Sequence, residues 1–97
     1  MKDKLRKRRI ELDEELKIIL DMKIQVIQEL ISNKPELEVT YFIPDSKKDG
    51  GRYETILDNI NKIDIYKQKM IMQNGAIIDI KEIIDINSDI FKNLKFE

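Results

Sequence analysis

The sequence predicts an α+β fold, in which one N-terminal helix is followed by five short antiparallel strands. Three observations support this. Apolar residues before Pro35 recur at intervals of three and four, as on one face of a helix. Apolar residues after Pro35 alternate with polar ones, as in half-buried strands. Turn-forming residues, among them Gly50, Gly51 and Gly75, divide this second part into short segments.

The helix is expected over about residues 11–32. Asp13, Glu14 and Glu15 suit its first turn, where carboxylates meet the positive end of the helix dipole. Lys34 precedes a proline and is therefore pushed out of the helical region, which predicts the stop. Lys23 is expected to face solvent, as is Gln28.

The first strand is predicted over 37–43, where Leu37, Val39, Tyr41 and Ile43 share one face and Pro44 ends the strand. The second strand, over about 52–63, changes phase along its length, which predicts a bulge or sharp bend. Asn74-Gly75 predicts a type I′ hairpin turn. The remaining strands are expected over 69–73, 76–80 and 83–86, with one helical turn at 81–82.

One long bent strand among short ones is the layout of an Sm-like or SH3-like barrel, predicted here over residues 37–86. A chain of 97 residues fits one domain. The expected organisation is a basic arm over 1–10 and a single domain over 11–97, which ends in a tail over 87–97.

The residue inventory argues against catalysis and against bound cofactors. The chain contains no histidine and no cysteine, so it lacks the commonest general base, a thiolate nucleophile and the usual transition-metal ligands. The pair Gly50-Gly51 is not a phosphate-cradling motif, and Asp64 is expected to cap a turn rather than to act in hydrolysis. We therefore expect a protein that is not an enzyme, with no cofactor and no metal.

Charge is distributed unevenly along the chain. The first ten residues hold six cations and one acid, a net charge of +5, while the whole chain carries −1. This basic arm is a candidate phosphate-binding site, with Lys4, Arg6, Lys7, Arg8 and Arg9 as its candidate residues. No apolar run suits a signal peptide or a spanning helix, so a cytoplasmic location without membrane contact is expected.

Two apolar regions exceed what a small core needs, and both are candidate protein interfaces. The helix is apolar over more than half of its circumference, and the last strands are rich in isoleucine on both faces. An oligomer could pair through the edge of the last strand. The candidate interface residues are Ile18, Met22 and Val26 on the helix, Phe42 on the first strand, and Ile84 and Ile86 on the last.

Four segments resemble the YolD-like family: 37–42, 57–64, 69–72 and 78–86, within a similarity that covers about residues 12–86. The resemblance implies a small Sm-like barrel protein of Gram-positive bacteria, their phages and mobile elements. Such proteins are often encoded beside a Y-family translesion DNA polymerase, which implies an accessory role to that polymerase in SOS DNA repair.

Three hypotheses about function follow. The first is a non-enzymatic accessory or adaptor protein of the YolD-like type, which acts on a protein partner such as a Y-family polymerase. The second is a small Sm-like nucleic-acid-binding protein that uses the basic arm. The third is a structural homo-oligomer from a mobile element, without a nucleic-acid role.

Overall fold

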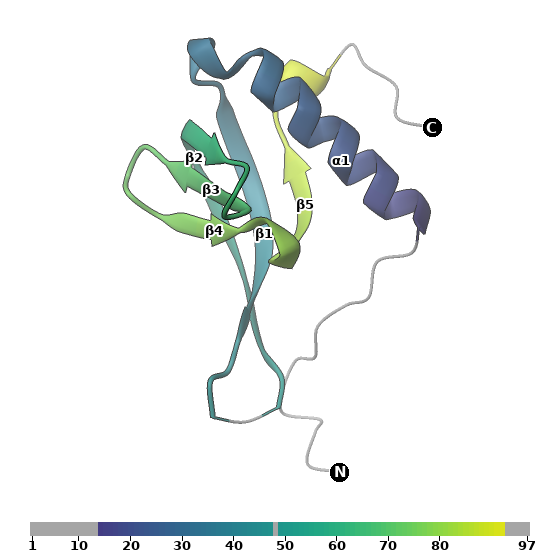
Figure 1. Ribbon diagram of the computed structural model, residues 1–97, viewed down its shortest axis with the longest axis vertical. Helices are drawn as coiled ribbons and strands as arrows, with labels where there is room; N and C mark the ends of the chain where they lie inside the picture. Colours follow the sequence, from purple (N-terminus) through teal and green to yellow (C-terminus); the bar gives the residue numbers. More distant parts are fainter. Residues whose placement is uncertain (1–13, 48, 93–97) are drawn as a thin grey trace.

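The computed structural model describes residues 14–47 and 49–92, which form one helix beside a five-stranded antiparallel sheet (Figure 1). The helix is α1 (Glu14–Glu29). The strands are β1 (Glu36–Pro44), β2 (Gly51–Asp64), β3 (Lys69–Met72), β4 (Ile77–Asp79) and β5 (Ile83–Asn87). Single 3-10 turns lie at η2 (Ile31–Asn33), η3 (Ile80–Glu82) and η4 (Asp89–Phe91).

The helix ends before the proline, as the sequence predicts. Glu14 and Glu15 lie in the first turn of α1, where their negative charges interact favourably with the positive end of the helix dipole. After η2, Lys34 adopts a left-handed conformation with φ of 49°, which reverses the chain into β1. Residues 11–13 of the predicted helix lie outside the described residues.

The strand order is β4-β3-β2-β1-β5, and the long strand β2 belongs to both halves of the sheet. Its first part pairs with β1 and its last part with β3. The register between β2 and β3 shifts between Ile60 and Lys62, so the irregularity predicted for this strand is confirmed. The shift lets β2 turn from one partner to the other.

The described strands do not close into a barrel. The sheet has an open order, and no ladder joins its end strands β4 and β5 within residues 14–47 and 49–92. The α+β prediction is confirmed, whereas the sheet shown here is open where a closed barrel was predicted.

The core is formed mainly by the sheet, with α1 packed beside β5, and the buried residues among those described are apolar. The helix contributes Ile27, which is fully buried, and Leu20 and Ile24 pack against the same cluster. The buried cluster comprises Ile27, Leu37, Val39, Ile60, Met70, Met72, Ile78, Ile83 and Ile86.

Side chains build two of the turns. Asp64 Oδ1 accepts a bond from the Lys67 amide at 3.1 Å, which confirms that Asp64 caps the turn between β2 and β3. The type I′ prediction for Asn74-Gly75 is wrong, because only Gly75 has a positive φ, of 95°, and that turn type needs two such residues. The backbone N–H of Asn74 instead donates to Asp58 Oδ2 at 2.9 Å, so this bond holds the loop against β2.

Candidate protein-interaction surface

The side of α1 that faces away from the sheet carries a row of apolar side chains. Ile18 and Met22 lie one turn apart, at 55% and 42% exposure, and Val26 continues the row as a half-buried residue. We call Ile18, Met22 and Val26 the outer stripe. Ile27, by contrast, is fully buried against the sheet. The helix is therefore apolar on two sides, of which the sheet covers one.

Four exposed carboxylates surround the outer stripe, and we call them the acidic rim: Glu14, Glu15, Asp21 and Glu29. The first three lie three or four positions from Ile18, and Glu29 lies three positions from Val26, so each is a helix-surface neighbour of the stripe. The cations of α1 are Lys17 and Lys23. Lys17 is not three or four positions from any residue of the outer stripe. Lys23 is three positions from Val26, but its side chain contacts β5.

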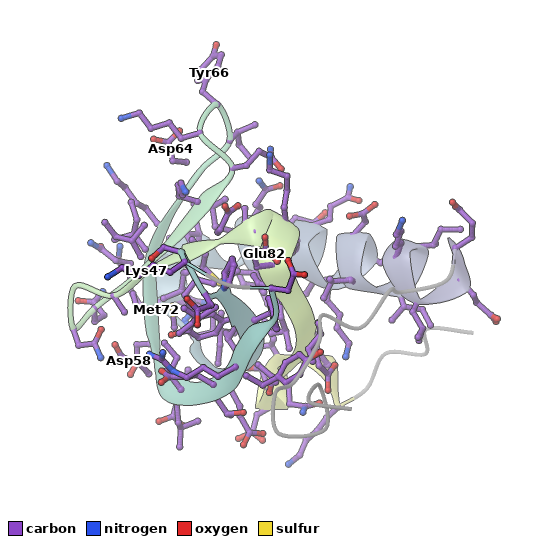
Figure 2. The ribbon with its side chains drawn as sticks, turned by 90° about the horizontal axis from the view of Figure 1, so that it is seen from below. Lys47, Asp58, Asp64, Tyr66, Met72 and Glu82 are labelled. Carbon is purple, nitrogen blue, oxygen red and sulfur yellow. The ribbon has the colours of Figure 1, made fainter. Side chains whose placement is uncertain are left out.

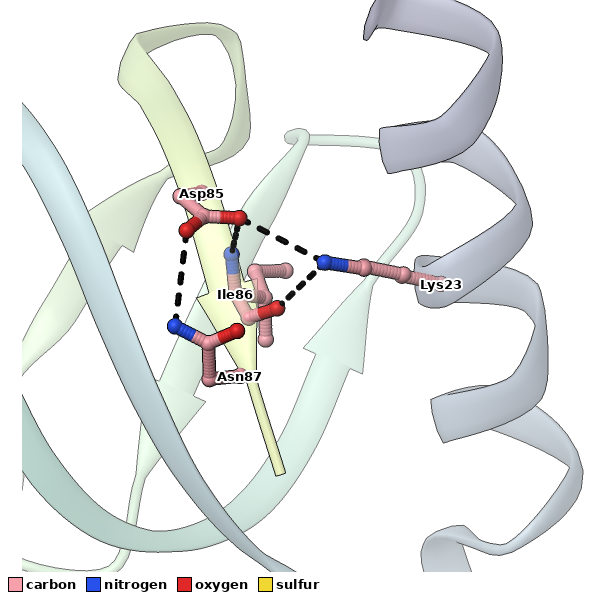
Figure 3. Close-up of polar contacts among 4 residues, drawn as sticks. All are labelled: Lys23, Asp85, Ile86 and Asn87. Atoms are coloured by element: carbon pink, nitrogen blue, oxygen red, sulfur yellow. Dashed lines mark hydrogen bonds and ion pairs between the residues drawn. The ribbon is translucent and has the colours of Figure 1, made fainter. Parts of the chain in front are cut away.

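Lys23 joins the helix to the last strand (Figure 3). Its side chain is only 15% exposed, and Nζ donates to the Ile86 carbonyl at 2.8 Å and to Asp85 Oδ1 at 3.4 Å. The same Nζ lies 5.5 Å from the centre of the Phe91 ring, within the range of a cation–π contact. The prediction that Lys23 faces solvent is wrong, because the helical period places it beside Ile27 and Leu20.

These contacts bind the backbone of Ile86 on the outer edge of β5. The Ile86 amide donates to Asp85 Oδ1 at 2.9 Å, so side chains bind both backbone polar atoms of Ile86. A sheet edge whose polar groups are bound in this way is a poor template for another strand. The predicted interface residue Ile86 is fully buried and offers no side-chain surface to a partner, while Ile84 is half-buried.

Phe42 also differs from its prediction as an interface residue. It is 3% exposed, and its ring meets Tyr53 edge to face at a centroid distance of 5.1 Å. Gly51 makes room for the ring, since a Cβ there would lie 2.8 Å from Phe42 Cζ and still closer to the Ile43 carbonyl. Phe42 is thus an internal residue of the β1–β2 hairpin.

An open groove of about 570 Å³ lies near the start of β1 and the end of β5. Ser88 Oγ donates to the Glu36 carbonyl at 2.7 Å and so ties η4 to β1 along its wall. Leu57 is 66% exposed there, opposite Glu38. The groove combines apolar side chains with charged ones of both signs; its lining includes Lys23, Glu36, Glu38, Leu57, Asp89, Ile90, Phe91 and Lys92.

Further apolar side chains are exposed at the β2–β3 turn and on β4. Tyr66 is 99% exposed at the tip of that turn and points away from the body (Figure 2). Its neighbour Ile65 is 54% exposed, and Ile77 on β4 is 64% exposed. No sequence pattern marked Ile65 and Tyr66, because exposure at a turn tip depends on the lengths of the strands that carry it. Ile77 belongs to the isoleucine-rich last strands that the sequence indicated.

The phosphate-binding candidates Lys4, Arg6, Lys7, Arg8 and Arg9 lie outside the described residues. Within the part that the structure describes, no three His, Cys, Asp or Glu side chains gather in a way that could hold a metal ion. None of the helical structure in that part is long and apolar enough to cross a membrane.

Comparison with protein-family models finds no match to this chain. Comparisons with curated proteins and with solved structures find none either. The resemblance to YolD-like proteins therefore stays a prediction from the sequence segments 37–42, 57–64, 69–72 and 78–86.

Proposed function

We propose that this protein is a non-enzymatic adaptor that binds a protein partner through the outer stripe of α1. One observation carries the proposal: Ile18 and Met22 are large, apolar and about half exposed, on the side of the helix opposite its buried residue. Single exposed apolar residues are ordinary, but a row at helical spacing is a typical docking surface.

The alternative of a structural homo-oligomer is less well supported by the charges on α1. Two copies of α1 paired in antiparallel fashion would place Glu14 and Glu15 beside the partner's Glu29, and the last turn holds no cation to offset them. Parallel pairing would bring like residues together. Both arrangements are repulsive. The backbone of Ile86, bound on the outer edge of β5, also weakens the case for pairing through that strand.

The resemblance to YolD-like proteins makes a Y-family translesion DNA polymerase the first partner to test. In this proposal the chain is a small Sm-like accessory protein of SOS DNA repair, in which α1 contacts the polymerase and the sheet supports the helix. Nothing in this role requires catalysis by the chain itself.

The experiment is affinity purification with three full-length baits: the wild type, Met22→Glu and Gln28→Glu. Gln28 is the control, because the same carboxylate enters α1 away from the stripe. A specific partner is retained by the wild type and by Gln28→Glu, and binds Met22→Glu at least about tenfold more weakly when measured with purified components. The proposal is overturned if every retained protein binds Met22→Glu as well as the wild type.

Nucleic-acid binding by the basic arm is a second candidate function, favoured by the net charge of +5 over the first ten residues. This proposal rests on Lys4 and on the run Arg6 to Arg9. It is compatible with the adaptor proposal, since the arm and the outer stripe are different parts of the chain.

A further inference from the structure

We infer that the partner segment recognised by α1 is a basic amphipathic helix, with apolar side chains on one face and Lys or Arg beside them. This inference rests on the proposed adaptor function and adds the chemistry of the partner. Its basis is the position of the acidic rim around the outer stripe.

The apolar part of the recognition comes from the outer stripe. Ile18, Met22 and Val26 follow one another at four-residue spacing along α1. Such a row matches a partner helix that presents apolar residues at the same spacing, which is the usual arrangement when two helices pack. The stripe is about two turns long, so the matching segment is a short helix rather than a large surface.

The electrostatic part comes from Glu14, Glu15, Asp21 and Glu29. These four carboxylates are exposed, and each neighbours a residue of the stripe. Lys23, the one cation of α1 at such a spacing, is bound to β5. A partner with Lys or Arg at the flanks of its apolar row would pair with the rim, whereas an acidic partner would be repelled.

Glu14 and Glu15 also stabilise the helix itself, because they lie in its first turn. Their presence is therefore explained without a binding partner. Asp21 and Glu29 do not stabilise the helix in this way. Asp21 lies in the middle of the helix, and Glu29 lies at its C-terminal end, where a negative charge opposes the dipole. The positions of these two acids are therefore better explained by a binding surface than by stabilisation of the helix end.

Two synthetic peptides of about 18 residues, or five helical turns, test the inference. Both carry the same leucine stripe; the other positions are lysine in one peptide and glutamate in the other. Binding to the full chain is measured by fluorescence anisotropy at about 0.05 M and about 0.5 M salt. We expect the lysine peptide to bind, with affinity that falls as salt rises, and the glutamate peptide not to bind.

Variants assign the binding to α1. Asp21→Lys combined with Glu29→Lys should weaken binding of the lysine peptide by roughly tenfold, since each exposed ion pair is worth up to about fivefold. The matched control, Glu36→Lys combined with Glu38→Lys, makes the same change of net charge on β1 and should leave binding within about twofold. Ile18→Gln combined with Met22→Gln should abolish binding.

The outcomes separate the inference from the proposed function. Equal binding of both peptides, lost in the Ile18→Gln, Met22→Gln variant, would overturn the basic partner and leave the docking stripe intact. Binding of the lysine peptide that survives this variant, or that weakens equally in the β1 control, would show attraction to any acidic surface and would overturn the inference. Failure of both peptides to bind would overturn it as well, while the affinity purification above still tests the adaptor function.

Discussion

Lys23 contacts three groups at once, and its surroundings explain why a lysine is tolerated on the inner side of α1. The aliphatic stem lies among apolar neighbours while Nζ reaches Asp85 and the Ile86 carbonyl. A hydrogen bond from a charged donor to a backbone carbonyl is among the stronger ones in proteins, because one partner is ionised. Lys23 therefore positions α1 against β5 as well as contributing to stability.

We expect Lys23→Ala to lower the free energy of unfolding by about 1–3 kcal/mol, because it removes a charged hydrogen bond and part of the helix–strand contact. Urea denaturation followed by circular dichroism measures this change. Lys17→Ala on the same helix is the control and should stay within about 0.5 kcal/mol of the wild type. Equal effects of the two substitutions would show that the Lys23 contacts contribute nothing to stability.

Tyr41 is the residue through which stability should respond to alkaline pH. Burial raises the pKa of its phenol, the nearby Glu54 raises this pKa further, and Arg52 opposes the shift. In the unfolded chain a tyrosine ionises near pH 10. As the pH rises past that value, the unfolded state loses its proton before the folded state does, and the free energy of unfolding falls.

The expected result is that the wild type loses more stability between about pH 9 and about pH 11 than Tyr41→Phe does. The measurement is the urea midpoint of each protein at both pH values. Tyr66→Phe, at the exposed turn tip, is the matched control and should keep the wild-type difference. If Tyr41→Phe loses as much stability as the wild type, the phenol is not the source of the alkaline sensitivity.

At the scale of elements, α1 presents one apolar side to the core and another to solvent. Ile27→Ala should cost about 2–5 kcal/mol, since it leaves a cavity in a fully packed site. Ile18→Ala should change stability by less than about 0.5 kcal/mol, because that side chain is more than half exposed. Differential scanning calorimetry of both variants measures the contrast. A large loss for Ile18→Ala would mean that the chain itself covers the outer stripe.

Elements were predictable from the sequence where a local pattern fixes them. The alternation of Leu37 and Val39 predicts β1, and Pro35 with Lys34 predicts the end of the helix. The phase change near Ile60 predicts the irregularity in β2. These signals are local, because each depends on residues that are neighbours along the chain.

The candidate interaction surface was predictable only in part, because whether a side chain is covered depends on contacts between distant parts of the chain. Ile18 and Met22 lie outside as expected, yet the equally apolar Ile86 is buried, since α1 and the sheet close over it. Phe42 is internal because Gly51 and Tyr53 leave space for its ring. Lys23 could have been found, because four-residue spacing aligns it with Ile27; a lysine on such a row signals a buried polar contact.

At the scale of the whole molecule, the charge is divided between a basic N-terminal arm and an acidic remainder. The arm carries +5 and the chain as a whole −1, so the other residues together carry −6 and do not favour nucleic acid. Any nucleic-acid affinity should therefore come from the arm and be sensitive to salt.

We expect light scattering to give the mass of a monomer, 11.6 kDa, for the protein alone. With a short DNA oligomer at low salt, an increase in mass that disappears at moderate salt and in the variant with Arg6 to Arg9 replaced by alanine would establish the nucleic-acid function of the arm. An unchanged mass with DNA would refute that function. A stable dimer in the absence of DNA would instead show that the like charges around the outer stripe do not prevent self-association.

The hydrogen bond between Lys23 on α1 and Ile86 on β5 joins residues that are synthesised at different times. Lys23 and its acceptor Ile86 are separated by 63 positions. At a translation rate of roughly 5–20 residues per second, α1 precedes its docking site by about 3–13 s. Until β5 is made, the inner side of α1 lacks the strand that it contacts most in the finished protein. We therefore expect the docking of α1 to be completed only after β5 has been synthesised.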